Sequence, residues 1–380
     1  MTQLITENET LAHFCRQALS RPLLAVDTEF IRQTTLYPKL GLVQLFDGEQ
    51  LALVDPLAIT DWQPLRELFA SEHSVKMMHS CTEDLEALAT IGIDVIRPLF
   101  DTQLAAELAG WGSSMGYARL VEQVTGELLD KSESRTDWLA RPLTDAQLSY
   151  AANDVRFLFP LYQAFNSSFD SGHLALLLAE GELLTQRKTQ HLPLEYRYLE
   201  VKQSWLLAPR ELAVLRELCR WRLQYARQHD IALGLILKDF QLLELAKRRP
   251  STTESLMNIP AMQEQRSARR HARILTELIH DAKQVPPEQC PQTFYHQDIF
   301  TGYKDVMAQL SVSVKLAAEA RNIPPEFLSV KRQMHEYFNW CWRISDTERA
   351  ELPLPEYLTG WRRHYLAPYL PLPEHTGFVL

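Results

Sequence analysis

The stretch Leu23-Leu24-Ala25-Val26-Asp27-Thr28-Glu29-Phe30 joins an apolar run to two carboxylates two residues apart. The run predicts a strand, and alternate side chains of a strand share one face. Asp27 and Glu29 would therefore point together, about 7 Å apart along the backbone. Two carboxylates this close repel each other unless a cation lies between them, and hard oxygen ligands favour Mg²⁺ or Mn²⁺. The stretch thus predicts a strand that ends in part of a metal site.

Strand-like and helix-like stretches alternate through residues 1–165, which predicts a mixed sheet covered by helices. We expect strands at residues 23–30, 41–46, 51–55 and 75–79, and helices at 83–89, 102–109 and 145–165. A second Asp-x-Glu, Asp47-Gly48-Glu49, contains the glycine of a hairpin turn. The spacing of Asp27 and Glu29 is therefore weak evidence for a metal site by itself. Whether the pair belongs to such a site depends on the remaining acidic residues.

The composition is that of a globular protein with two or three domains: 380 residues, of which 46% are hydrophobic. No apolar stretch approaches the length of a membrane span, and the first residues lack the pattern of a signal peptide. The five cysteines are scattered and never form a Cys-x-x-Cys pair. We therefore expect a cytoplasmic protein without disulfides and without a structural zinc site.

Charge is distributed unevenly along the chain, whose net charge is −9. Residues 1–190 carry 14 Lys and Arg against 26 Asp and Glu, whereas residues 191–380 carry 25 against 22. Divalent cations would offset part of the acidic charge of the first half. The second half is mildly basic, which permits contact with a phosphate backbone but does not demand it.

Helical periodicity replaces the strand pattern beyond about residue 190, and the second half contains a faint internal repeat. Ala226-Arg-Gln-His-Asp-Ile231 resembles Ala318-Glu-Ala-Arg-Asn-Ile323 at an offset of 92, and Arg269-Arg270-His271 recurs as Arg362-Arg363-His364 at an offset of 93. A proline-rich segment at 285–291 would join the copies. Two matches at nearly one offset predict two copies of a small helical domain, although short matches also arise by chance.

Two further acidic positions complete the series. Glu83-Asp84 lies where a strand ends and a helix begins, and Ser80 or Thr82 is expected to cap that helix. By themselves these acids would only complement the positive end of the helix dipole. Tyr150 and Asp154 are four residues apart in a predicted helix, so that their side chains share one face.

Asp27-x-Glu29, Asp84 and Tyr150-x-x-x-Asp154, in this order, resemble the three exonuclease motifs of the DEDD superfamily. The tyrosine matches the DEDDy branch, because the DEDDh branch would need histidine at position 149, which is Ser149. Within that branch the chain is most similar to the bacterial ribonuclease D family, and the supporting stretches are residues 37–46, 101–103 and 129–138. The two helical copies resemble HRDC domains.

The resemblance implies an α/β exonuclease of RNase H-like fold, with a mixed sheet flanked by helices, followed by two all-α HRDC domains. It also implies two divalent metal ions, Mg²⁺ or Mn²⁺. Asp27 would bridge both ions, Glu29 and Asp154 would complete the first, Asp84 would hold the second, and Tyr150 would aim the attacking water. The implied enzyme is a 3′–5′ exoribonuclease that trims tRNA precursors and other structured RNAs and releases nucleoside 5′-monophosphates.

Several other side chains are candidates for contact with RNA. They are Phe30, Gln44, Lys131, Ser132, Arg135, Trp138, Arg269 and Arg270. Phe30 is also a good core residue, and residues 131–138 also fit a solvated surface loop. Arg269 and Arg270 belong to a run of arginines along one side of a predicted helix, and charged helix faces often face only solvent.

We expect an exonuclease domain at residues 1–190, an HRDC domain at 205–288 and an HRDC-like domain at 294–376, in a monomer that binds RNA and no membrane. The helical domains would surround the active site as a ring. Two alternatives stay open: the same chemistry on DNA, since no single residue identifiably senses the 2′-hydroxyl, and a non-catalytic RNA-binding adaptor. The adaptor predicts an eroded acidic set, whereas all four carboxylates and Tyr150 are present.

Overall fold

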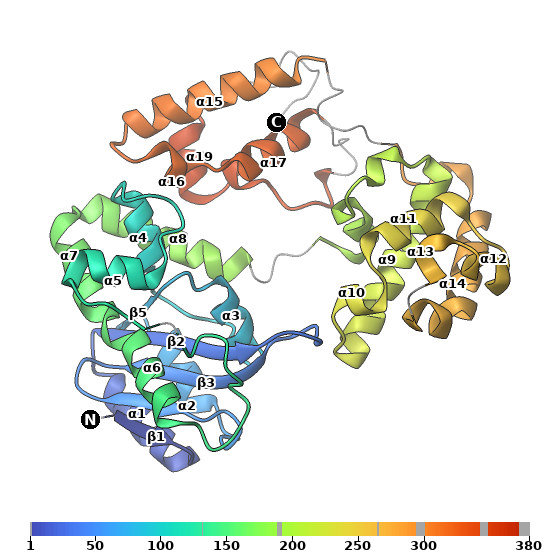
Figure 1. The fold of residues 1–380 in the computed structure, drawn as a ribbon. Coiled ribbons are helices and arrows are strands. Elements are labelled where there is room, and N and C mark those ends of the chain that lie inside the picture. The colour runs from blue at the N-terminus through green and yellow to red at the C-terminus, as the bar shows by residue number, and fades with distance from the viewer. Residues whose placement is uncertain are drawn as a thin grey trace.

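The computed structural model describes residues 2–130, 132–187, 192–263, 266–293, 301–342 and 349–371. Figure 1 shows three parts: an α/β domain up to residue 187, a first helical domain from α9 to α14, and a second helical domain from α15 to α19. The predicted order of a mixed sheet followed by two helical copies is confirmed. No helix in the described ranges is long and apolar enough to cross a membrane.

The α/β domain is built on a six-stranded mixed sheet in the order β1-β4-β3-β2-β5-β6. The strands are β1 Thr2–Ile5, β2 Leu23–Ile31, β3 Lys39–Phe46, β4 Leu51–Val54, β5 Val75–Met78 and β6 Leu99–Asp101. Central β2 pairs antiparallel with β3 and parallel with β5. Four strands lie where the sequence predicts them, whereas the short β1 and β6 were not predicted.

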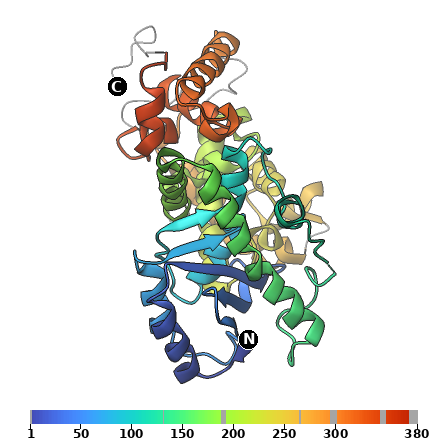
Figure 2. The same cartoon turned by 90° about the vertical axis from the view of Figure 1, so that its left-hand side faces the viewer.

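Helices cover both faces of this sheet (Figure 2). The helices of the α/β domain are α1 Asn8–Ala18, α2 Gln63–Ala70, α3 Thr82–Ala89, α4 Thr102–Leu108, α5 Tyr117–Thr125, α6 Asp145–Arg156, α7 Leu158–Ser168 and α8 Ser171–Arg187. Leu24 and Val26 belong to the core shared with α1, α2 and α3, whereas Ala25 belongs to the core shared with α6 and α7. Alternation along β2 therefore sends Asp27 and Glu29 toward the α6 side and Thr28 toward the α3 side.

Local details confirm one prediction and correct two. The hairpin turn is confirmed. Gly48 has a φ of +96°, and Asp47 Oδ1 accepts hydrogen bonds from the backbone N–H groups of Glu49 and Gln50. The predicted cap of α3 is wrong: neither Ser80 nor Thr82 caps it, and the residue at the cap is Cys81, which makes no side-chain cap bond. The single helix expected at 145–165 is two helices, since Pro160 has no N–H to bond the carbonyl four residues back.

The first helical domain has its own buried core. Its α-helices are α9 Pro209–His229, α10 Leu233–Ile236, α11 Asp239–Arg248, α12 Thr253–Met257, α13 Pro260–Gln263 and α14 Arg266–Gln284, and the 3₁₀ helices η1 Leu194–Glu200, η2 Ser204–Leu206 and η3 Pro287–Gln289 flank them. The described α-helices of the second helical domain are α15 Tyr303–Glu319, α16 Pro325–Leu328, α17 Lys331–Trp342 and α19 Gly360–Leu366, with the 3₁₀ helix η5 Glu356–Leu358.

The internal repeat is confirmed in the backbone at the predicted offset of 92. Helices α10 and α16 begin and end 92 residues apart. Asp230 and Asn322 both take left-handed backbone conformations, with φ of 48° and 52°. The side chains of Gln241 and Gln333 each accept a 2.8 Å bond from the backbone N–H three residues earlier. The two copies are thus the same unit, folded twice.

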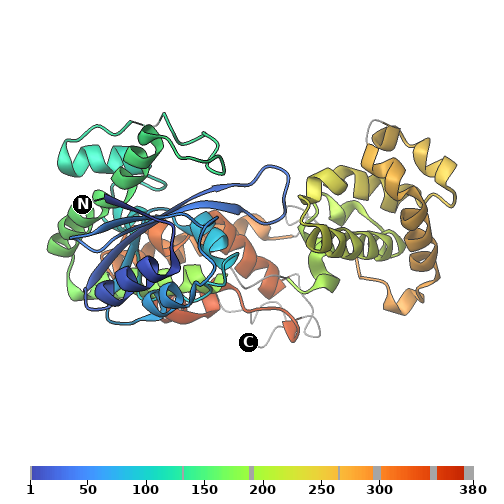
Figure 3. The same cartoon turned by 90° about the horizontal axis from the view of Figure 1, so that it is seen from below.

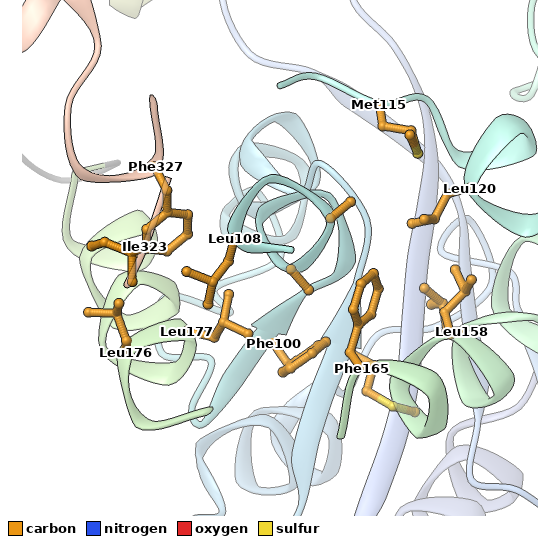
Figure 4. Packing of buried hydrophobic residues seen from close by; sticks show 14 of the residues in the cluster. Phe100, Leu108, Met115, Leu120, Leu158, Phe165, Leu176, Leu177, Ile323 and Phe327 are labelled. Carbon is orange, nitrogen blue, oxygen red and sulfur yellow. The ribbon is translucent and has the colours of Figure 1, made fainter. Parts of the chain in front are cut away.

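The second helical domain shares a core with the α/β domain. Ile323 and Phe327 lie against Leu108, Leu176 and Leu177 in one continuous apolar cluster (Figure 4). Beside this cluster the guanidinium of Arg362 on α19 forms a 2.5 Å ion pair with Glu180 on α8, and both side chains are almost fully buried. These two parts therefore form one body.

The first helical domain is attached to this body through small polar contacts. The backbone N–H of Ala232 donates to the Thr34 carbonyl at 2.9 Å, and the Tyr37 N–H donates to Asp230 Oδ1 at 3.0 Å. Figure 3 shows the β2–β3 hairpin reaching the first helical domain at this point. On the other side, the Tyr196 hydroxyl donates to Glu351 of the second helical domain at 2.7 Å. The three parts therefore close a ring of contacts.

Candidate active site

The acidic residues come together at the end of β2. They are contributed from both faces of the sheet. Asp27, Glu29, Tyr150 and Asp154 line a cavity of about 230 Å³ between β2 and α6. Asp84 comes from α3 on the opposite side, is buried, and accepts a hydrogen bond from the Thr28 hydroxyl. The strand thus presents two carboxylates to α6 and uses the intervening threonine to orient the carboxylate from α3.

Burial and mutual repulsion raise the pKa of all four carboxyl groups. Burial, followed by the charge of Asp154, raises the pKa of Asp27. Burial, with the other three carboxylates, raises the pKa of Glu29 to about 10. Burial and Asp27 raise the pKa of Asp84, and burial and Asp84 raise that of Asp154. In the described part of the chain, no cationic side chain is among the groups that act on these pKa values.

Four carboxylates with this electrostatics have the donor chemistry of a site for hard divalent cations. The described residues nevertheless contain no three acidic, histidine or cysteine side chains that are already arranged as a closed ligand set. Carboxylates that repel one another have no reason to converge without a cation between them. The donor chemistry of these four side chains therefore fits a divalent metal.

Tyr150 lies beside Asp154 on the face of α6 that lines the cavity. Burial, followed by the charge of Asp154, raises the pKa of Tyr150 well above its usual value, so that the phenol keeps its proton. A hydrogen bond from Tyr150 to the Asp154 carboxylate opposes the rise in the pKa of Asp154. The i and i+4 spacing therefore pairs a proton donor with a carboxylate, as the sequence predicts.

Two aromatic residues that the sequence analysis did not predict also line the cavity, His79 after β5 and Tyr117 on α5. Their rings lie 5.3 Å apart. His79 Nδ1 is 2.9 Å from the Thr102 hydroxyl, which itself donates to the Met78 carbonyl. The Tyr117 hydroxyl donates to the Asn153 carbonyl at 3.2 Å, which ties α5 to α6.

The residues predicted to touch RNA are distributed over several environments. Gln44 and Trp138 are 0% and 1% exposed, so the structure corrects the prediction of direct contact and places both in the core. Phe30 is half-buried and packs on the α1–α3 side. Ser132, Arg135, Arg269 and Arg270 are exposed; Ser132 lies beside Tyr150 and Asp154, and the last two residues are on α14. Lys131 lies outside the described residues.

The loop that carries Trp138 is clamped to the sheet by Arg141. This guanidinium donates to both oxygens of Asp55 at 2.6 and 2.7 Å and to the carbonyls of Gly41 and Trp138. Gly41 on β3 lies so close to Trp138 that an added Cβ would be 2.6 Å from its carbonyl oxygen. The segment at 132–141, which contributes Ser134 to the cavity wall, is therefore held against β3.

Comparison with known proteins places this site in a family. The 3′-5′ exonuclease model matches residues 2–170, the HRDC domain model matches 211–279, and the model of the C-terminal HRDC domain of ribonuclease D matches 301–370. Ribonuclease D of Shewanella sp. (strain ANA-3) is 39% identical over 95% of this chain and 91% of the relative. Ribonuclease D of Escherichia coli (strain K12) is 36% identical over 96% of each.

Solved structures agree with the sequence relatives. The crystal structure of Escherichia coli RNase D, described as an exoribonuclease involved in structured RNA processing, covers 97% of both chains with a TM-score of 0.89 and 36% identity. A protein from Bifidobacterium adolescentis shares the fold, with a TM-score of 0.68 and 24% identity. The chain therefore belongs to the ribonuclease D family and is a 3′–5′ exoribonuclease with two HRDC domains.

Proposed function

We propose that this enzyme trims the 3′ ends of tRNA precursors and other structured RNAs, one nucleotide at a time, and releases nucleoside 5′-monophosphates. The observation that carries the proposal is the set of four carboxylates and one tyrosine at the end of β2. The similarity to an exoribonuclease of structured RNA supports the choice of substrate. The two helical domains beside the nuclease favour a substrate that extends beyond its reacting end.

Asp27, Glu29, Asp84 and Asp154 would hold two divalent cations, Mg²⁺ or Mn²⁺. Bound cations would supply stabilisation of the negative charge that develops during hydrolysis of a phosphodiester. The protein supplies the rigid frame: β2 fixes Asp27 and Glu29, and the Thr28 hydroxyl orients Asp84. Burial and mutual repulsion raise the pKa of Glu29 and Asp84, and bound cations would offset that repulsion, which supports this assignment.

Tyr150 acts as a hydrogen-bond donor that positions the attacking water. A phenol with a raised pKa keeps its proton near neutral pH, so it can orient a water molecule but cannot remove its proton. His79 and Tyr117 form the opposite wall of the cavity and would limit where the terminal nucleotide lies. Ser132 and Arg135 are exposed, and Ser132 lies beside Tyr150 and Asp154, so we expect this pair to contact phosphates.

A denaturing-gel time course of a 5′-labelled tRNA precursor tests the proposal. Stepwise shortening should require a divalent metal, and EDTA should stop it. Asp154→Asn should lower the rate roughly 100-fold or more, because it removes a metal ligand. Asp145→Asn is the matched control, since Asp145 is exposed in the first turn of the same helix. Binding without shortening under every metal would contradict the proposal, and a matched DNA oligomer would test the choice of sugar.

A further inference from the structure

The first helical domain carries a row of aromatic side chains along α9. Trp221, Tyr225 and His229 follow one another at intervals of four residues, so that they share one face of the helix. Ring centroids are 5.6 Å apart between Trp221 and Tyr225 and 4.2 Å apart between Tyr225 and His229. Trp221 and Tyr225 are half-buried and His229 is exposed. We call these three residues the aromatic strip.

A fourth ring fixes the strip in place from the neighbouring helix. His271 on α14 meets Trp221 edge to face at 5.2 Å and Tyr225 at 4.7 Å. His271 is 9% exposed, so it supports the strip from the buried side. The rings are therefore held by packing, with part of their surface left to solvent.

Exposed arginines lie on the two helices that carry the strip and its supporting ring. They are Arg227 on α9 and Arg269 and Arg270 on α14, whereas Arg222 is buried against Asp239 and Arg273 is paired with Glu277. Arg270 is exposed, and its charge lies close enough to His271 to add to the effect of burial in lowering the pKa of that ring. A line of aromatic faces inside a basic border is the combination with which proteins bind single-stranded nucleic acid.

The second copy of the repeat shows that the strip is not part of the helical fold itself. At the offset of 92, Trp221 and Tyr225 correspond to Ser313 and Ala317, which are 6% and 0% exposed. In that copy the Ser313 hydroxyl donates to the Tyr369 carbonyl, so the same helix face is covered by the chain's own last described residues. The second helical domain therefore folds without these rings. The first helical domain has them and leaves them partly exposed.

The strip leads toward the α/β domain. His229, its last member, precedes Asp230, which accepts the hydrogen bond from Tyr37 on the β2–β3 hairpin. From Trp221 to His229 the helix rises roughly 12 Å, enough for a few stacked bases. β2 itself carries Asp27 and Glu29.

We propose that the aromatic strip, with Arg270, is a stacking site for unpaired bases of single-stranded RNA, which holds the strand upstream of the 3′ end that the nuclease shortens. The proposal rests on the proposed function for its RNA substrate, but binding at the strip needs neither metal nor hydrolysis. The second helical domain, whose equivalent face is covered, has a docking role instead.

The test is fluorescence anisotropy of the full-length protein with a 5′-labelled adenosine oligomer in EDTA. Trp221→Leu and Tyr225→Leu keep apolar volume for packing but remove the rings, and each should weaken binding roughly tenfold. Tyr225→Phe keeps the ring and should restore wild-type binding. Phe240→Ala is the matched control, because Phe240 is 52% exposed on α11 of the same domain and outside the strip.

A strand of abasic ribose phosphates separates stacking from charge. It should bind wild type and Tyr225→Leu equally, whereas the adenosine oligomer should distinguish them. Equal binding of the adenosine oligomer to Tyr225→Leu and Phe240→Ala, with the melting curves of both like that of wild type, would overturn the proposal that the aromatic strip stacks on bases. Failure of wild type to shorten any RNA would overturn the proposed function and leave this binding result intact.

Discussion

Burial and mutual repulsion raise the pKa of each of the four carboxylates at the end of β2, so that ionising any of them opposes folding of the metal-free protein. Asp84 is 8% exposed and faces the charge of Asp27, so its ionised form lacks the solvation that it has in the unfolded chain. The sequence predicted the chemistry of these residues from their order and spacing. It could not predict their burial, or the walls formed by His79 and Tyr117, because those depend on segments that only the tertiary fold brings together.

Replacing Asp84 by asparagine should stabilise the metal-free protein. The amide keeps an oxygen that can accept the Thr28 hydroxyl, and it removes a buried charge, so the free energy of unfolding should rise by roughly 1 to 3 kcal/mol. Thermal unfolding in EDTA measures this gain. Wild type should gain stability when Mg²⁺ is added, whereas Asp84→Asn should gain much less. A variant that is less stable than wild type in EDTA would contradict the repulsion described here.

Asp55 should stabilise the fold at neutral pH and lose this effect in acid. Burial alone would raise its pKa, but the hydrogen bonds and charge of Arg141 outweigh burial and hold the pKa below its usual value. A carboxyl with a lowered pKa in the fold stabilises it above the unfolded pKa, and this contribution is lost as the pH falls through the folded pKa. The difference in Tm between wild type and Asp55→Asn should therefore be largest near neutral pH and shrink in acid. Asp61→Asn, at an exposed position just before α2, is the control.

At the scale of elements, the four inner strands were predicted, whereas the two edge strands β1 and β6 and helices such as α1 and α8 were not. Strands β2 to β5 have apolar runs that end at turn residues, which is why the sequence places them. β1 and β6 have four and three residues and become strands only because β4 and β5 offer them a paired edge. The loop with Trp138 looked like a polar surface loop, since its neighbours are charged, yet the Arg141 clamp buries the indole.

Gly41→Ala should loosen this loop. The new Cβ would lie 2.6 Å from the Trp138 carbonyl oxygen and 2.8 Å from its Cβ, and the backbone must shift to relieve the overlap. We expect a loss of roughly 1 to 3 kcal/mol in stability, together with a lower kcat/KM, because the segment that forms one cavity wall moves. Urea unfolding and trimming rates measure both effects.

Gly116→Ala is the matched control for this substitution. Gly116 precedes α5 next to the cavity, has a φ of −75°, and leaves open space for a Cβ. Its variant should therefore keep its trimming rate and nearly all of its stability. If Gly41→Ala were no less stable than Gly116→Ala, the close approach of Trp138 to β3 would not hold the loop.

At the scale of the whole molecule, the second helical domain shares a buried core with the α/β domain, whereas among the described residues the first meets that domain through hydrogen bonds at Thr34 and Tyr37. Glu180→Gln should destabilise the fixed body by roughly 3 kcal/mol, because it leaves the buried Arg362 with only the longer contact to Glu356 at 3.7 Å. Hydrogen exchange should show faster exchange in α8 and α19 and unchanged protection in α9. Glu244→Gln breaks an exposed pair with Arg248 and should cost less than about 1 kcal/mol. Equal costs for the two variants would show that the buried pair does not hold the body together.

The core that joins the α/β domain to the second helical domain can be completed only late in synthesis of the chain. Leu176 and Leu177 leave the ribosome early, but Ile323, Phe327 and Leu366, which complete their cluster, follow after the whole first helical domain has been made. Leu366 comes 189 residues after Leu177, roughly 10 to 40 s of synthesis. During that interval the newborn nuclease carries an uncovered apolar face, so its completion depends on how soon the last part of the message is translated.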